Sequence, residues 1–203
     1  LCREIDDRLG GTTLFINGAQ GGMVTADIRH PDGEHETWDE CERIGRTLAG
    51  EVLRILAAAQ VQADPALHCA WQVLRFPVKA PMAALFQMAD TAVRMELDGE
   101  DCLAVPQHLV QIGSARLLTV PGEALPNIGC FLKRKLDSPF PFLLGLANDA
   151  LGYMLSRADY DSFPVYEYIS ATCLGEETGE ILMDRSLELI AEMDARLAPQ
   201  GAA

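Results

Sequence analysis

Short β-rich runs alternate with helical segments along this chain, and one pair of runs has the pattern of a hairpin. The runs 109–112 and 116–120 are separated by Gly113, Ser114 and Ala115, which predicts two antiparallel strands joined by a tight turn. The other expected elements are strands at 12–17, 70–78 and 140–146 and helices at 38–59, 82–97, 124–136 and 184–197. Interleaved strands and helices predict an α/β fold, and the hairpin predicts a mixed β-sheet with flanking helices.

The helix expected at 38–59 has the strongest local signals. Thr37 and Glu40 have the spacing of a capping box, in which each side chain satisfies a free backbone amide at the start of the helix. Its apolar residues recur at helical spacing and form one face, made of Ile44, Leu48, Val52, Ile55, Leu56 and Ala59. In the closing helix, the residues expected to point inward are Leu187, Ile190, Ala191 and Met193.

Composition limits the class of protein. The chain has 203 residues, is 49% hydrophobic and carries a formal net charge of −14. This apolar content is enough to build a core, and no repeat or linker divides the chain, so residues 1–203 are expected to form a single domain. The negative charge argues against nucleic acid as a partner and against electrostatic docking on anionic lipid. No apolar stretch reaches the roughly 20 residues of a transmembrane helix.

The cysteines are spread along the chain without the spacing of a disulfide framework or a zinc knuckle. They are Cys2, Cys41, Cys69, Cys102, Cys130 and Cys173. This distribution favours reduced and mostly buried thiols, although spacing alone leaves pairing in space open. The localisation of the protein is not indicated.

Three expected strands end in polar or glycine-rich turns, which lie at 17–27, 121–123 and 147–149, with Tyr153 just beyond the last one. In α/β sheets, ligands bind outside the carboxyl ends of strands, because the loops there line a common crevice. These three turns are therefore expected to converge on a site.

The glycines of the first turn have two interpretations. Gly18, Gly21 and Gly22 either bring bare backbone amides close to a substrate oxygen, or simply allow the chain to turn. No Lys follows them as in a nucleotide-binding P-loop, and the chain contains no G-x-S-x-G motif of an α/β-hydrolase.

The four histidines are His30, His35, His68 and His108, and none of them forms a compact pair of metal ligands. His30 and His35 flank a polar stretch that is typical of a solvated loop. A less favoured alternative is that one of these two binds a metal from a rearranged loop.

Taken together, the three turns resemble the neutral/alkaline, non-lysosomal ceramidases. Residues 15–27 are similar to the family segment F-x-x-G-x-x-G-D-V-S-P-N, and residues 112–123 to I-G-x-x-x-x-x-x-V-P-G-E. Residues 145–153, followed by 159–160 and 166–167, resemble its G-L-x-N-x-x-x-x-Y, E-E-Y and Y-E stretches. The order and approximate spacing agree over about residues 12–175, and the similarity is closer to the shorter, uncharacterised ceramidase-like proteins than to the true ceramidases.

This resemblance implies a zinc-dependent amide hydrolase. The family holds its metal with two His, one Glu and one Tyr; the Glu falls on Glu123 and the Tyr on Tyr153. The two family histidines lie upstream of the segment matched by residues 15–27, so this chain does not contain them. From the residues alone, Glu123 could instead cap the following helix and Tyr153 could be a core residue.

The resemblance also implies a nucleophile and contacts to substrate. The catalytic Ser of the family falls on Thr25, whose hydroxyl is capable of the same chemistry. The neighbouring family Asp is replaced here by Met23. Gly21, Gly22 and Tyr166 fall on substrate-binding positions, although Tyr166 could equally be a half-buried aromatic residue.

We therefore expect residues 1–203 to be the C-terminal part of a larger ceramidase-like catalytic domain, since the chain begins at Leu1 without an initiating Met. Its expected substrate is a small-molecule or lipid amide. The alternative is a non-catalytic binding or structural domain that retains the fold without the metal. The sequence does not indicate an oligomeric state.

Overall fold

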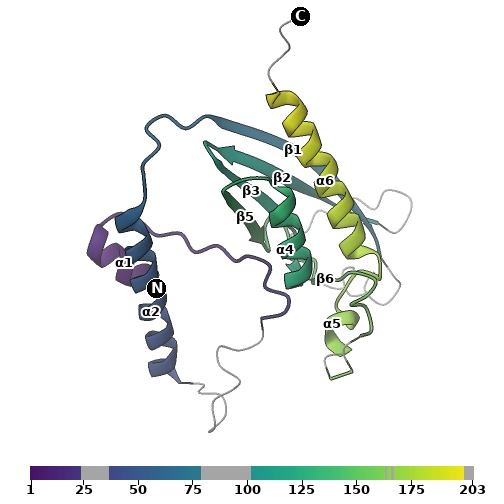
Figure 1. Cartoon of the computed structure of the whole chain (residues 1–203). Helices are drawn as coiled ribbons and strands as arrows, with labels where there is room; N and C mark the ends of the chain where they lie inside the picture. The colour runs from purple at the N-terminus through teal and green to yellow at the C-terminus, as the bar shows by residue number, and fades with distance from the viewer. Residues whose placement is uncertain (24–36, 79–101, 163, 166, 199–203) are drawn as a thin grey trace, which may run out of the picture. The chain divides into compact units, whose positions relative to one another are not determined.

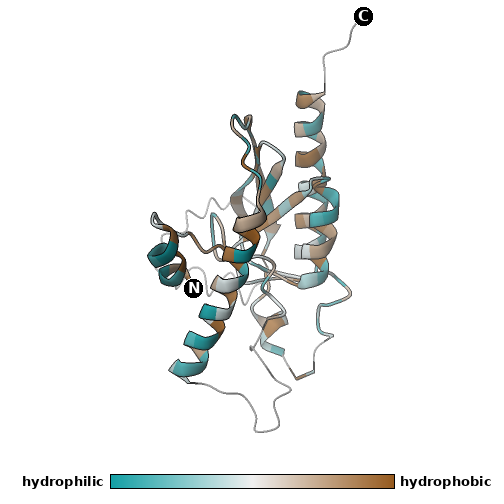
Figure 2. Cartoon of the chain, turned by 60° about the vertical axis from the view of Figure 1, so that its left-hand side comes forward, coloured by the Kyte–Doolittle hydropathy of each residue, from teal (hydrophilic) through white to brown (hydrophobic). Residues whose placement is uncertain are grey.

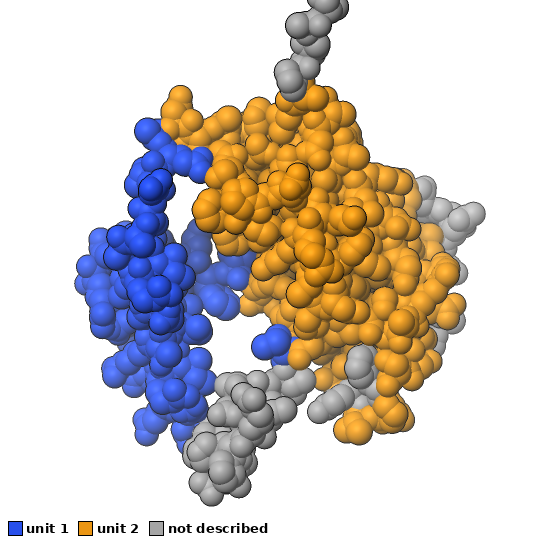
Figure 3. All heavy atoms as spheres, viewed as in Figure 1, with its two compact units in different colours: residues 1–16, 23–63 blue, residues 17–22, 64–203 orange. Residues whose placement is uncertain are grey.

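The structure is a computed structural model that describes residues 1–23, 37–78, 102–162, 164–165 and 167–198. The helix expected at 82–97 lies outside the described residues. The chain divides into two compact units (Figure 3). Unit 1 comprises Leu1–Ile16 and Met23–Ala63, and unit 2 comprises Asn17–Gly22 and Asp64–Ala203. Each unit is described separately, and the single domain expected from the sequence stays a prediction.

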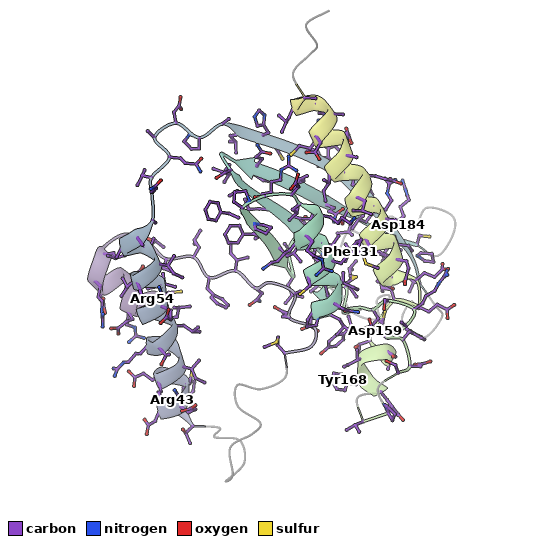
Figure 4. The ribbon with its side chains drawn as sticks, viewed as in Figure 1. Arg43, Arg54, Phe131, Asp159, Tyr168 and Asp184 are labelled. Carbon is purple, nitrogen blue, oxygen red and sulfur yellow. The ribbon has the colours of Figure 1, made fainter. Side chains whose placement is uncertain are left out.

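Unit 1 contains the helices α1 (Cys2–Leu9) and α2 (Trp38–Ala58). The helix α2 starts where the sequence predicts, because the Thr37 hydroxyl accepts a hydrogen bond from the Glu40 backbone amide at 3.2 Å. The other half of the expected capping box differs, since the Glu40 carboxylate accepts from the Arg43 guanidinium at 2.6 Å. Figure 4 shows Arg43 near the first turn of α2.

The strand expected at 12–17 is wrong, because this segment is irregular. Thr13 is instead bound to the preceding helix. The Asp6 carboxylate of α1 accepts hydrogen bonds from both the amide and the hydroxyl of Thr13, each at 2.7 Å. A β-rich composition without a neighbouring strand does not produce a ladder.

The apolar face of α2 exists, but little of it is buried. Ala49 is the buried residue of this helix, while Ile55 remains 58% exposed. Hydrophilic residues predominate in α1 and in the amino-terminal half of α2 (Figure 2). The helical period of the sequence therefore identified the helix correctly, but not which of its residues are buried.

Unit 2 is built on a four-stranded mixed sheet, which confirms the expected α/β fold. Its strands are β1 (Leu67–Pro77), β2 (Cys102–Ile112), β3 (Ala115–Val120) and β5 (Phe140–Gly145), in the order β1-β2-β3-β5. The first two pairings are antiparallel and the β3–β5 pairing is parallel. The predicted hairpin joins β2 and β3, although β2 begins well before residue 109.

A second, smaller sheet pairs two short strands in parallel, β4 (Glu123–Ala124) and β6 (Tyr153–Met154). The helices of unit 2 are α4 (Pro126–Lys135), α5 (Glu167–Ala171) and α6 (Thr178–Leu197). The helix α6 begins earlier than the predicted residue 184.

The core lies between one face of the sheet and the helices α4 and α6, which cross that face in Figure 1. Its largest fully buried side chains include Leu74, Phe76, Leu109 and Leu118 from the sheet and Ile128, Leu132 and Leu182 from the helices. On α6, Ile190 and Met193 are buried as expected. The expected inward position of Ala191 is wrong: this residue is exposed and Leu189 is buried instead.

On its other face, the sheet carries apolar side chains that remain exposed. The register places Cys69, Val110, Leu117 and Phe142 in one row across the four strands. Phe142 is 48% exposed, and Trp71, which lies on the same face of β1, is 64% exposed. Within unit 2, no described helix covers this face, which we call the open sheet face.

None of the described helices is long and apolar enough to cross a membrane. All six cysteines are free, as expected. The expectation that most of them are buried is wrong, because Cys173 is buried whereas Cys41, Cys69 and Cys130 are exposed.

A buried amide network joins α6 to the sheet. The side chain of Gln107 is 0% exposed. Its amide nitrogen donates to the Ser186 hydroxyl at 2.8 Å and to the Thr119 carbonyl at 3.2 Å. Its amide oxygen accepts from Gln72 Nε2 at 2.8 Å, so both ends of the Gln107 amide are satisfied.

Replacing Gln107 by Leu is expected to lower the free energy of unfolding by about 3 kcal/mol, because it leaves buried polar partners unsatisfied. Chemical denaturation of the purified chain measures this change. As a control on α6, which the network joins to the sheet, Glu188→Ala is expected to alter the free energy by less than ~0.5 kcal/mol, since that side chain is solvent-exposed. Equal stability of the Leu variant and the unmodified chain would contradict the importance of the network.

Candidate functional site

Backbone hydrogen bonds bring together the described parts of the three turns. The Gly145 amide donates to the Asn17 carbonyl, and the Gly21 amide donates to the Ala124 carbonyl, both at 2.9 Å. The Glu123 amide donates to the Gly152 carbonyl, also at 2.9 Å. The convergence expected from the sequence is therefore present in the structure.

The turns approach each other so closely that glycine is required at their contact points. A Cβ atom on Gly21 would lie 2.4 Å from the Glu123 carbonyl oxygen. A Cβ atom on Gly152 would lie 2.0 Å from the Thr172 carbonyl oxygen, and Gly152 also has a φ of +81°. These glycines allow direct contact between neighbouring backbones.

Glu123 and Tyr153 lie opposite each other in the parallel β4–β6 pair. The phenol of Tyr153 lies near the Glu123 carboxylate and interacts with the Tyr168 side chain. The two tyrosine rings meet edge to face, with their centroids 5.9 Å apart. Tyr168 belongs to α5, where Figure 4 labels it.

These neighbours raise the pKa of Tyr153 well above its ordinary value. The largest cause is burial, followed by the hydrogen bond with Tyr168 and the negative charge of Glu123. The phenol therefore keeps its proton at neutral pH, and any cation that binds the phenol oxygen must displace that proton.

A glutamine holds the Glu123 carboxylate from another direction. Gln20 Nε2 donates to Glu123 Oε1 at 3.2 Å. Glu123 does not cap α4, because the N-cap of that helix is Leu125 and it makes no side-chain capping bond. The carboxylate is instead directed to Gln20 and Tyr153.

Asn148 fixes the turn that follows β5. It has a φ of 74°, a conformation that Asn tolerates better than most residues. Its side-chain amide donates to the Pro106 carbonyl at 2.8 Å and to the Thr119 hydroxyl at 3.0 Å, and it lies 3.1 Å from His108 Nδ1. The side chain thus holds the carboxyl end of β5 against β2 and β3.

The residues expected from the sequence have different outcomes. Glu123 and Tyr153 lie together, whereas Thr25 and Tyr166 lie outside the described residues. Gly21 is buried, and its amide already donates a hydrogen bond to the Ala124 carbonyl, while Gly22 is exposed. The substrate-binding roles of these residues stay predictions.

The sequence analysis missed Gln20 and Tyr168. Gln20 directly precedes Gly21 in a segment that the ceramidase resemblance had already marked, so its position was a usable signal. Tyr168 had no such signal, because only the packing of α5 brings its ring to Tyr153.

The donor set at Glu123 and Tyr153 fits part of a zinc site. The β4–β6 pairing places a carboxylate and a phenol on directly opposed residues of neighbouring strands. Zinc in proteins takes four ligands, often including imidazole nitrogens. Across the part of the chain that the structure describes, no group of three or more His, Cys, Asp or Glu residues could hold a metal. The pair therefore fits half of the shell that the resemblance implies.

No protein-family model matches this chain. No curated protein matches it either. Among solved structures, the neutral ceramidase from Pseudomonas aeruginosa is similar, with a TM-score of 0.61 and 15% sequence identity. The match covers 87% of this chain but 36% of the ceramidase. A ceramidase complexed with C2 matches at a TM-score of 0.42 and 21% identity, covering 50% of this chain and 16% of that one.

The first of these matches shows that the two proteins share a fold, although only 15% of the aligned residues are identical. The mixed sheet and its flanking helices are consistent with part of a ceramidase-like domain. The ceramidase resemblance of the sequence is thus confirmed at the level of the fold.

We expect Gly21→Ala to destabilise the chain by about 2 kcal/mol, because its new methyl group would clash with the Glu123 backbone. Gly18→Ala in the same segment is the matched control, since no atom lies within 4 Å of its added Cβ. Thermal or denaturant unfolding measures both variants. Similar stabilities of the two variants would show that the turns are not in close contact.

The raised pKa of Tyr153 predicts a pH dependence of stability. The stabilisation is complete below the ordinary tyrosine pKa of 10.0 and is lost as the pH rises toward the higher folded-state value, because only the unfolded phenol releases its proton in that window. Tyr153→Phe is expected to flatten the loss of stability above pH 10.0. Denaturant unfolding at several alkaline pH values tests this. An unchanged slope in Tyr153→Phe would contradict the environment described for the phenol.

Proposed function

We propose that this chain is part of a zinc-dependent hydrolase of amide or related acyl bonds. The observation that carries the proposal is the contact between the Glu123 carboxylate and the Tyr153 phenol at the point where three turns meet. Two converging oxygen donors at the carboxyl end of a mixed sheet are suited to holding a metal ion next to a substrate. The fold of a neutral ceramidase supports the same reaction class.

Each residue of the proposed site has a distinct role. Glu123 and Tyr153 would hold zinc, and two further His ligands would come from polypeptide outside this sequence. When bound, zinc polarises an acyl carbonyl and lowers the pKa of water or a hydroxyl. Thr25 would be the nucleophile, and Gly21, Gly22 and Tyr166 would contact the substrate.

The proposed substrate is a small-molecule or lipid amide, and the proposed functional unit is larger than residues 1–203. The open sheet face supports this larger unit, because exposed apolar side chains such as Trp71 and Phe142 mark surfaces that contact other polypeptide. The chain spans 36% of the ceramidase that it resembles. A larger catalytic domain would cover this face and contribute the missing nitrogen ligands.

A direct test is the zinc affinity of the full-length gene product that contains this chain, measured by competition with a chromogenic chelator. We expect Glu123→Ala and Tyr153→Phe each to weaken zinc binding by at least about tenfold, because each removes an oxygen ligand. Matched controls are Asp184→Asn on α6 (labelled in Figure 4) and Tyr160→Phe. Zinc binding unaffected by both site variants would contradict the assignment.

A second candidate function is that of a non-catalytic binding domain, and the open sheet face favours it because exposed apolar patches mark interaction surfaces. The zinc measurement separates the two candidates. If the chain is part of a zinc enzyme, the variants at Glu123 and Tyr153 should bind zinc more weakly than the control variants. If it is a binding domain, its function does not depend on Glu123 or Tyr153.

A further inference from the structure

We propose that Gln20 is a positioning residue that fixes the orientation of the Glu123 carboxylate. This inference rests on the proposed function, since it gives Gln20 a role in the same site. Gln20 Nε2 donates to Glu123 Oε1 at 3.2 Å, over a separation of 103 residues in the sequence. Gln20 would therefore act on the metal or substrate through Glu123.

The backbone around Gln20 is held on both sides, so its side chain starts from a fixed position. On the carboxyl side, the Gly21 amide donates to the Ala124 carbonyl at 2.9 Å. On the amino side, Ala19 packs against the core next to Gly129, where an added Cβ would lie 2.3 Å from the Ala19 Cβ. The amide of Gln20 is thus directed at the Glu123 carboxylate by backbone and core contacts that do not involve the Glu123 side chain.

Two side chains restrict the carboxylate from different elements. Gln20 binds its Oε1 from between Gly18 and Gly21, and the Tyr153 phenol lies near it on β6. A carboxylate has about four acceptor positions, so these two side chains leave others for a metal ion or substrate. Such supporting hydrogen bonds orient metal ligands and are typically worth about 10- to 100-fold in metal affinity.

Glutamine is suited to this role because its amide is a neutral donor. A Lys or Arg at the same place would compensate the Glu123 charge and compete with a bound cation. The Gln20 amide stabilises one orientation of the carboxylate and leaves its full negative charge available. We therefore attribute to Gln20 the orientation of the ligand, and not its ionisation.

The variant Gln20→Met tests this role, because it keeps the length of the side chain and removes the donor. We expect it to weaken zinc binding to the full chain about 10- to 100-fold in the chelator competition. Gln111→Met is the matched control: Gln111 accepts from Arg116 at 2.9 Å in the β2–β3 hairpin, and its loss is expected to leave zinc affinity unchanged. Equal zinc affinities of the two variants would overturn the positioning role while leaving the metal assignment of Glu123 intact.

A double-mutant cycle without metal keeps the test independent of the proposed function. Gln20→Glu is expected to destabilise the chain, because two carboxylates would face each other. The combination of Gln20→Glu with Glu123→Gln restores a donor–acceptor pair. Its unfolding equilibrium constant is expected to be roughly fivefold lower, and the chain more stable, than the sum of the two single effects predicts. Additive effects in this cycle would overturn the inference, whether or not the chain binds zinc.

Discussion

Backbone hydrogen bonds between the segments around the three turns determine where Gln20, Glu123 and Tyr153 lie. The carbonyls of Asn17, Ala124 and Gly152 each accept from an amide of a segment distant in the sequence. This assembly requires backbones in direct contact, which explains the glycine at position 21. The Asn148 side chain adds to this frame by holding the turn after β5 against β2 and β3.

Much of the fold could be predicted because its signals are local. The hairpin of β2 and β3 is encoded by two β-rich runs and a short turn, and the start of α2 by Thr37. The convergence of the turns followed from the general position of ligand sites in α/β sheets. The false strand at 12–17 shows the limit of this reasoning. Its residues favour an extended backbone, but a strand also needs a neighbour, and composition does not specify one.

The candidate site could be predicted only in part for the same reason. Glu123 and Tyr153 were found because ordered motifs marked them, and the β4–β6 pairing then placed them side by side. Gln20 acts across 103 residues of sequence, and Tyr168 reaches Tyr153 through the packing of α5. Contacts of this kind arise from the tertiary fold and leave no periodicity in the sequence.

The environment of Tyr153 also determines how this site can bind a cation. Burial, the Tyr168 side chain and the negative charge of Glu123 raise the pKa of Tyr153. A cation that takes both oxygens has to displace the proton, so its binding must be coupled to proton release. Two oxygen ligands, one of them a phenol with a raised pKa, do not by themselves offset the free-energy cost of displacing that proton. Nitrogen ligands from a larger catalytic domain would add the missing binding energy, and the polypeptide that carries them would also be available to cover the open sheet face.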